Sequence, residues 1–111
     1  MDINTIENLP LPEEEIWELR LYVAGKSAKS LSAIANLQRI CEEFLNGRYK
    51  IEVIDLVEHP HIARKEQIIA VPTLIKQLPL PLKQIIGDLS NQEKVLIGLE
   101  IRKIDYYEVS K

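Results

Sequence analysis

Few residues of this chain could carry out covalent chemistry, and they do not form a recognisable catalytic set. The 111 residues include one cysteine, Cys41, and two histidines, His59 and His61. A single thiol cannot form an intramolecular disulfide or a multi-cysteine metal site, which fits a reducing compartment. The histidines flank Pro60 and have no evident third ligand nearby. We interpret them as solvent-facing residues at the start of a helix and predict no metal site.

The sequence also lacks the common motifs of nucleotide-binding and hydrolytic enzymes. It contains no glycine-rich phosphate loop, no nucleophile elbow and no helical His-Glu zinc motif. Ser27 and Tyr22 lie near an expected strand-to-helix turn, where either could activate a bound thiol as a glutathione transferase does. Ser27 is already explained as a helix cap. We predict a protein with no enzymatic activity and no cofactor, and keep a small glutathione-using enzyme as an alternative.

Charge and hydropathy narrow the choice of partners. Acidic and basic residues are interspersed and the formal net charge is -3, so there is no basic surface of the kind that binds nucleic acid or anionic membranes. No apolar run approaches the roughly 20 residues that span a bilayer, and the N-terminus does not resemble a signal peptide. We therefore expect a cytoplasmic protein that binds neither nucleic acid nor membrane.

The N-terminal half predicts a strand, a helix and a second strand. Residues 1–16 contain two prolines and an acidic run and are expected to form a flexible arm. Apolar residues alternate from Trp17 onward, which predicts a strand, and Ser27 can cap a helix that runs to about Leu45. The expected inward stripe of this helix consists of Leu31, Ile34, Ala35, Leu37, Cys41 and Phe44. A second alternating segment ends near Leu56, so this half is expected to be a parallel βαβ unit.

The C-terminal half predicts a further helix, a hairpin and a last helix. Pro60 suits the first turn of a helix whose period is set by Ile62, Ala63, Glu66 and Ile69. Thr73 to Leu78 and Leu82 to Ile86 are expected to be two strands. Ser90 and Glu93 form a capping box for a helix that stops near Gly98. Residues 90–104 are equally compatible with an extended chain.

The expected order β-α-β-α-β-β-α is that of an α/β, thioredoxin-like single domain, here residues 17–104, followed by a tail at 105–111. Pro72 lies where this fold places a cis-proline before its third strand. The redox centre of such a fold would lie in residues 24–28, which contain no cysteine. Cys41 is expected to be a buried, unreactive residue of the helix. We therefore discount disulfide exchange.

Several segments together resemble the KaiB family of cyanobacterial clock proteins and their bacterial relatives. The most specific runs from Leu78 to Ser90, Leu-Pro-Leu-Pro-Leu-Lys-Gln-Ile-Ile-Gly-Asp-Leu-Ser, and continues through residues 93–99. Residues 21–25, 53–55 and 72–74 are similar to the family in the same order. The resemblance covers about residues 19–100.

The resemblance implies a non-enzymatic regulator that binds the ring of a KaiC-type ATPase and modulates its phosphorylation or ATPase state. In the clock system the complex sequesters KaiA and displaces the sensor domain of the kinase SasA, so both are implied as further partners or competitors. The family is also known for fold switching: a resting homo-oligomer, dimer or tetramer, has an alternative C-terminal fold, and the thioredoxin-like monomer binds KaiC. A sensor domain of the SasA type is the alternative with the same fold.

The resemblance also assigns roles to individual residues. Lys76 and Lys83 match basic positions of the partner-binding half, although either could be a solvated surface lysine. Gly98 and Glu100 match the segment that balances the two folds, with Glu100 in place of the usual aspartate; Gly98 could also be a simple helix cap.

Three positions depart from the clock-type pattern. Ser32 and Gln84 stand where arginine is usual, and Glu52 stands where lysine is usual. A reversed charge at Glu52 should weaken contact with an acidic partner surface. We therefore expect a paralogue or non-clock homologue with an altered KaiA interaction.

Overall fold

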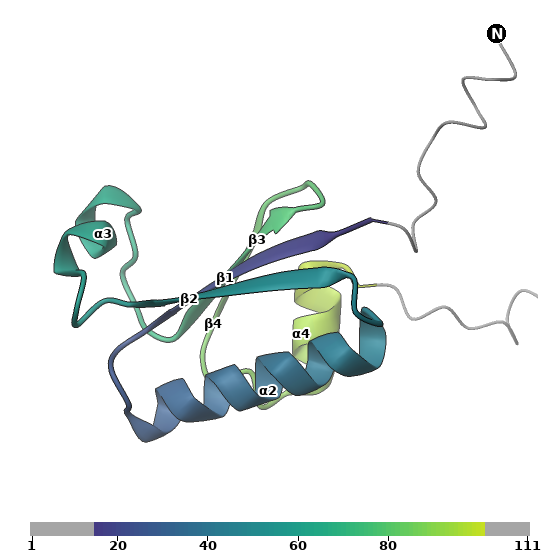
Figure 1. Ribbon diagram of the computed structural model, residues 1–111, viewed down its shortest axis with the longest axis horizontal. Coiled ribbons are helices and arrows are strands. Elements are labelled where there is room, and N and C mark those ends of the chain that lie inside the picture. The colour runs from purple at the N-terminus through teal and green to yellow at the C-terminus, as the bar shows by residue number, and fades with distance from the viewer. Residues whose placement is uncertain (1–14, 102–111) are drawn as a thin grey trace, which may run out of the picture.

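The structure, a computed structural model, describes residues 15–101 and contains a four-stranded sheet with three helices (Figure 1). The elements in chain order are β1 (Trp17–Val23), α2 (Ala28–Phe44), β2 (Tyr49–Asp55), α3 (Pro60–Lys65), β3 (Thr73–Leu78), β4 (Lys83–Ile86) and α4 (Gln92–Leu99). This order confirms the predicted β-α-β-α-β-β-α arrangement. The predicted tail, Ile104 and residues 1–14 of the predicted arm lie outside the described residues.

The sheet has the strand order β2-β1-β3-β4, so β2 and β4 are its edges. β1 is parallel to β2 and antiparallel to β3, and β3 is antiparallel to β4. α2 and α4 lie on the same side of the sheet, whereas α3 lies at one end of it (Figure 1). The parallel β1–α2–β2 unit is the one that the N-terminal half predicts.

One hydrophobic core lies between the sheet and the two longer helices. Leu19, Leu21 and Val23 of β1 point into it, as the alternation in the sequence predicts, and Val95 and Leu99 of α4 close it from the other side. The members contributed by α2 are Ala33, Leu37, Ile40 and Cys41.

The predicted inward stripe of α2 was partly wrong. Leu37 and Cys41 are buried as expected, but Leu31 is 52% exposed and Ala35 is also exposed. The buried face instead begins at Ser30, which is 1% exposed. Ser30 Oγ accepts the N–H of Ala24 in the β1–α2 turn, and the buried face that starts there continues through Ala33, Leu37, Ile40 and Cys41 and leaves Leu31 outside.

The helix predicted at Pro60 is shorter than expected. α3 ends at Lys65, and Gln67 takes a positive φ of 57°. The backbone N–H of Ile68 then bonds the carbonyl of Ala63, which closes the helix. Ile69 is consequently 86% exposed and does not belong to the helical period.

The predicted ends of the last helix also differ. The N-cap of α4 is Asn91, whose side chain accepts the N–H of Lys94 at 3.1 Å. The cap is therefore one residue later than predicted, and the N–H of Ser90 is bonded to Asp88 Oδ1 at 3.0 Å. Gly98 lies inside the helix, and the left-handed C-cap is Glu100, with φ 60°.

Candidate functional site

The turn between β1 and α2, where the fold class would place redox chemistry, is held by its own hydrogen bonds. Ser27 caps α2 as predicted, and its hydroxyl donates to Ser30 Oγ at 2.8 Å. Ser30 Oγ in turn accepts the N–H of Ala24 at 3.1 Å. Asp55 Oδ1 accepts the N–H groups of Gly25 and Val57, each at 2.9 Å, and the first of these bonds is the main reason that the pKa of Asp55 is lowered. These polar groups have structural roles.

The other two candidates for thiol chemistry are buried away from solvent. Tyr22 is 1% exposed, and its hydroxyl accepts from Arg20 Nη1 at 3.4 Å. Cys41 is fully buried in the core, and burial raises its pKa to about 12. Its thiol therefore stays protonated and has little nucleophilic character.

The structure gives no sign of a metal site in the part of the chain it describes. The rings of His59 and His61 lie edge to face, 6.2 Å apart. Within residues 15–101, no group of three or more His, Cys, Asp or Glu side chains is arranged to hold an ion. None of the described helices is long and apolar enough to cross a membrane.

The predicted partner-binding and fold-switch residues come together at the C-terminal end of α4. Lys76 on β3 is paired in register with Lys83 on β4. Lys83 Nζ lies 3.5 Å from the carboxylate of Glu100, which follows α4. We call Lys76, Lys83 and Glu100, with the Trp17 ring that contacts Lys76, the lysine cluster.

Lys76 is buried in the cluster. Its residue is 1% exposed, and its Nζ donates to the carbonyl oxygen of Leu99 at 3.0 Å. The same ammonium lies 5.0 Å from the centre of the Trp17 ring, within the range of a cation–π contact. A lysine near a helix C-terminus satisfies a carbonyl that has no partner within the helix. Lys76 in this conformation is therefore not a solvated surface lysine.

The electrostatics of the cluster follow from the burial of Lys76. Loss of hydration is the largest influence and lowers its pKa, and the neighbouring Lys83 acts in the same direction. Glu100 opposes this effect, but it also forms the ion pair with Lys83. The ammonium is thus less stable here than in water.

Gly98 allows α4 to approach β4 closely. A Cβ atom at this position would lie 2.8 Å from Cδ1 of Ile85, closer than carbon atoms pack. The explanation of Gly98 as a helix cap was therefore wrong: the left-handed residue is Glu100, and a larger residue at position 98 would need the Ile85 side chain to move.

Trp17 is the member of the cluster that sequence reasoning missed. Strand alternation contained part of the signal, because Leu74 and Lys76 are two residues apart and point to the same, buried side of β3. The contact with Trp17 depends on the register between β1 and β3, which pairs Leu19 with Lys76. The sequence analysis did not predict the register between β1 and β3.

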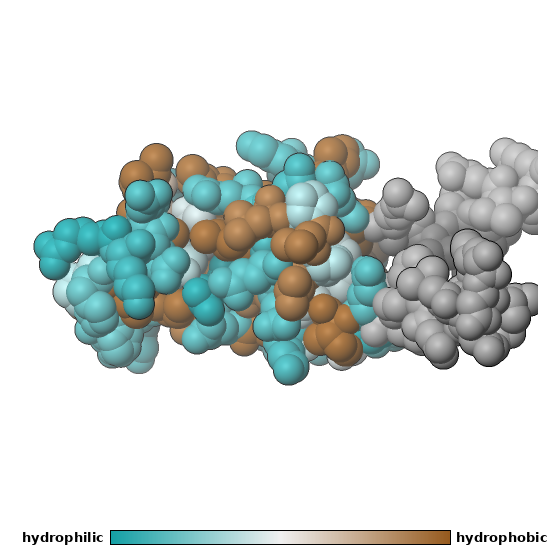
Figure 2. All heavy atoms as spheres, turned by 90° about the horizontal axis from the view of Figure 1, so that it is seen from above, coloured by the Kyte–Doolittle hydropathy of each residue, from teal (hydrophilic) through white to brown (hydrophobic). Residues whose placement is uncertain are grey.

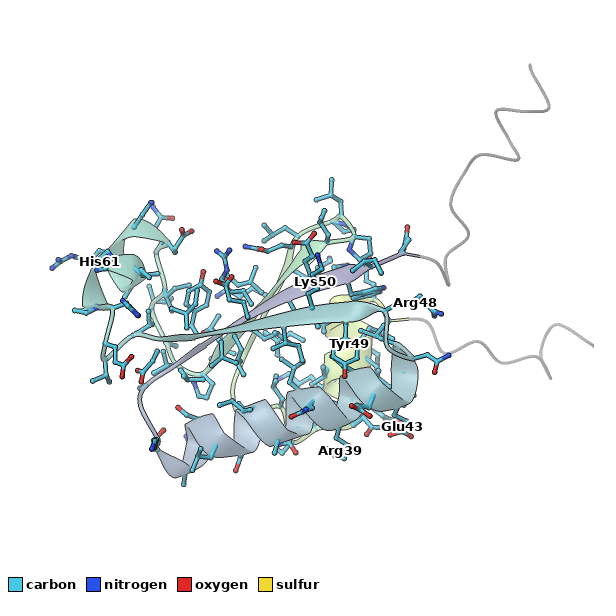
Figure 3. The ribbon with its side chains drawn as sticks, in the orientation of Figure 1. Arg39, Glu43, Arg48, Tyr49, Lys50 and His61 are labelled. Atoms are coloured by element: carbon cyan, nitrogen blue, oxygen red, sulfur yellow. The ribbon has the colours of Figure 1, made fainter. Side chains whose placement is uncertain are left out.

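The departures from the clock-type pattern lie on the surface. Glu52 is on the edge strand β2, and its carboxylate accepts from Arg20 Nε at 2.9 Å. Tyr49 points from β2 towards α2, while Lys50 points to the other side (Figure 3). By alternation Glu52 shares the side of Lys50, which α2 does not cover. Ser32 and Gln84 are also exposed.

Several apolar side chains are exposed at the β3–β4 hairpin and on the sheet. Leu78, Leu80 and Leu82 of the hairpin are 41%, 74% and 61% exposed. Apolar patches cross the face of the molecule that looks away from α2 (Figure 2). The peptide bonds before Pro72, Pro79 and Pro81 are cis.

The chain is similar to known proteins over nearly all of its described part. Residues 20–101 match the KaiB domain. The circadian clock protein KaiB3 of Synechocystis sp. is 58% identical over 83 residues, which are 75% of this chain and 81% of the relative. The circadian clock oscillator protein KaiB of Thermostichus vulcanus is 47% identical over 90 residues, 81% and 83% of the two chains.

Solved structures show the same fold at low sequence identity. The N-terminal domain of Synechococcus elongatus SasA matches with a TM-score of 0.64 at 18% identity, over 87% of this chain and 95% of that one. Chloroplastic thioredoxin z matches with a TM-score of 0.64 at 20% identity, over 91% and 90%. The fold is therefore thioredoxin-like. The domain match and the identity to both relatives show that the chain belongs to the KaiB family.

Proposed function

We propose that this protein is a clock-type regulator without catalytic activity of its own, which binds the ring of a KaiC-type ATPase and modulates its phosphorylation or ATPase state. The observation that carries this proposal is the KaiB domain match across residues 20–101. The β1–α2 turn supports it, because Ser27, Ser30 and Asp55 are all engaged in holding the turn. A cytoplasmic location accompanies this function.

Size-exclusion chromatography with light scattering tests the proposal. The protein is run alone, and after long incubation with a cognate KaiC and ATP. We expect it to co-elute with KaiC as a complex of ring size. Continued separate elution would contradict the proposal and point to a different partner.

Two lysine-to-alanine variants, one at Lys83 and a control at Lys29, extend the same experiment. The Lys83 side chain is 39% exposed, so it remains accessible to a partner while paired with Glu100. We expect Lys83→Ala to weaken the complex, whereas Lys29→Ala, which removes an exposed lysine from α2, should leave it unchanged. Equal binding by both variants would remove Lys83 from the partner surface.

We further propose that the interaction with KaiA is altered in this protein, and that a SasA-type kinase competes for the same complex. Glu52 places a negative charge on the exposed side of edge strand β2, where the clock-type pattern has a positive one. Because Glu52 is paired with Arg20, an acidic partner surface would lack the attraction that a lysine offers at this position.

Reconstitution with KaiC, ATP and KaiA tests this step. We expect little KaiA in the complex with the wild-type protein and more with Glu52→Lys. Glu58→Lys, an equal change of charge in the loop after β2, serves as the control. Unaltered KaiA capture by the wild-type protein would refute the proposal.

At rest we expect a homo-oligomer, dimer or tetramer, whose C-terminal half takes the alternative fold of the family. In the structure the proposed switch residues Gly98 and Glu100 lie at the end of α4, where Glu100 is paired with Lys83. The light-scattering run on the protein alone gives the mass directly. A monomer at all concentrations would contradict this expectation.

A further inference from the structure

The hairpin between β3 and β4 presents an apolar surface with a cation at its border. Leu78, Leu80 and Leu82 are exposed along it. Lys83 follows them as the first residue of β4, and its side chain stays 39% exposed although it lies 3.5 Å from the carboxylate of Glu100. Exposed leucines beside a lysine suit a short segment that carries both apolar and acidic side chains.

The chain enters the sheet next to this hairpin. Glu18 of β1 is paired with Leu78 at the end of β3, so the residues before β1 continue towards the hairpin loop at 79–82. The start of β1 and the hairpin loop lie at the same end of the sheet (Figure 1). Burial lowers the pKa of Lys76, and Glu15 is one of the charges that oppose this effect. The acidic residue closest to β1 therefore lies near enough to act on the lysine cluster.

The segment that leads into β1 has the matching chemistry. Residues 9–15 read Leu-Pro-Leu-Pro-Glu-Glu-Glu. Its two leucines can cover apolar surface of the hairpin, and its acidic run can face Lys83. The prolines restrict the backbone, which reduces the conformational entropy that docking would cost.

The tether makes a weak contact sufficient. A segment joined directly to β1 has an effective concentration in the millimolar range at the hairpin. A contact with a dissociation constant of about 1 mM would then be occupied about half of the time.

We propose that residues 9–15 dock on the β3–β4 hairpin of the same chain, with Leu9 and Leu11 against the exposed leucines and the acidic run at Lys83. The docked segment covers a surface that a partner would otherwise reach. Its effect on binding to a KaiC-type ring rests on the proposed function, because the segment would have to leave Lys83 before the ring could contact this lysine. The docking itself does not depend on that function.

Disulfide trapping on the full chain tests the proposal. One cysteine is introduced by Asn8→Cys, next to the docking segment, and a second by Leu80→Cys at the hairpin. Oxidised glutathione serves as the oxidant, and mass spectrometry follows the intrachain disulfide. Cys41 does not compete, because it is buried and its thiol stays protonated.

Charge reversal separates docking from collisions that the tether alone permits. Glu13→Lys with Glu14→Lys should slow trapping about fivefold, which corresponds to a loss of about 1 kcal/mol. The control, Asp2→Lys with Glu7→Lys, makes the same change of charge outside the docking segment and should stay within about twofold. Equal rates in both proteins would overturn the proposal, since only the tether would then bring the cysteines together.

A charge swap tests whether Lys83 is the residue that faces the acidic run. Lys83→Glu alone should slow trapping about as much as the reversal at positions 13 and 14. Combining the two changes should restore the rate, and a combined protein as slow as either parent would overturn the assignment. A disulfide between two chains would also overturn the proposal, because the hairpin would then bind the segment of a second copy. No KaiC-type partner is present in these reactions, so their failure leaves the proposed function standing.

Discussion

At the scale of single residues, the β1–α2 turn depends on one carboxylate. Asp55 Oδ1 accepts two backbone N–H groups, from Gly25 and Val57, that would otherwise lack a partner in the loops at this end of the sheet. Hydrogen bonds to the ionised form lower the pKa of the carboxyl group. Asp55 thus joins the end of β2 to the turn that precedes α2.

The lowered pKa of Asp55 predicts a dependence of stability on pH. A carboxyl group with a lower pKa in the folded state contributes stability above its ordinary pKa of 3.8, and this contribution is lost as pH falls through the folded pKa. Asp55→Asn should therefore lower the urea midpoint at neutral pH, and the difference from wild type should shrink in acid. Glu43→Gln, on the exposed side of α2, is the control. A constant difference at all pH values would contradict this role.

The sequence predicted the roles of some single residues correctly and of others incorrectly. Ser27 as cap and Cys41 as a buried residue were predicted correctly, because each depends on its own helix. Lys76 was not, because its burial depends on Trp17 and Leu99, which lie far from it in the chain. The roles of Lys83, Glu100 and Glu52 in partner binding and fold switching stay predictions.

At the scale of elements, α4 is positioned by its cap and by one close contact. Asn91 satisfies the N–H of Lys94 at the start of the helix. Gly98 lets the last turn approach Ile85 of β4. These two features set where α4 begins and how closely it lies against the sheet.

Capping by Asn91 can be separated from the capping box that the sequence predicts. Asn91→Ala should lower the free energy of unfolding by about 1 kcal/mol, since it leaves an N–H of the first turn without its acceptor. Ser90→Ala should change it by less than about 0.5 kcal/mol, because the Ser90 side chain is not the cap. Urea titrations of both variants give the comparison. The reverse order of effects would restore Ser90 as the cap.

Close packing at Gly98 predicts an interaction between two positions. Gly98→Ala should destabilise the domain by about 1 kcal/mol, because overpacking against Ile85 exceeds the gain in helix propensity. In the background Ile85→Val, which removes Cδ1, the same change should cost much less. A double-mutant cycle followed by thermal unfolding measures the coupling. Additive effects would show that Ile85 does not limit the approach.

The elements themselves were largely predictable, and their ends were not. Alternation and helical spacing located all four strands and all three helices of the described part. The helix before Ile69 ends early because the N–H of Ile68 bonds the carbonyl of Ala63, and the cap of α4 is Asn91 and not Ser90. Helical spacing does not specify which of several adjacent residues makes such a terminal bond.

At the scale of the whole molecule, the described leucines range from fully buried to largely exposed. Leu74 of β3 is fully buried in the core, whereas Leu80 at the hairpin is 74% exposed. An exposed leucine contributes little to folding, since it stays in contact with water. Such an exposed side chain is accessible to a partner.

Two substitutions compare the two extremes. Leu80→Ser should change the free energy of unfolding by less than about 0.5 kcal/mol. Leu74→Ala should lower it by about 2–5 kcal/mol through loss of burial and the cavity left behind. Chemical denaturation measures both values. A large loss in Leu80→Ser would mean that the hairpin tip is packed in solution.

The fold class was predictable because it follows from the order of elements, which local patterns specify. The side of the sheet on which each helix packs, and the register that brings Lys76 beside Trp17, needed the structure. These features arise from contacts between segments that are distant in the chain.

The strand order has a consequence for how the two halves of the chain are joined. The first half contributes β2 and β1, and the second contributes β3 and β4. Within the sheet, the halves meet along one seam, the antiparallel border between β1 and β3, with register pairs from Glu18 and Leu78 to Tyr22 and Thr73. Separating the sheet at this seam would leave the hydrogen-bonded β1–β2 pair intact on one side and the β3–β4 hairpin intact on the other. Moving the second half as a unit would therefore break one row of backbone hydrogen bonds in the sheet, together with the core contacts that the two halves share.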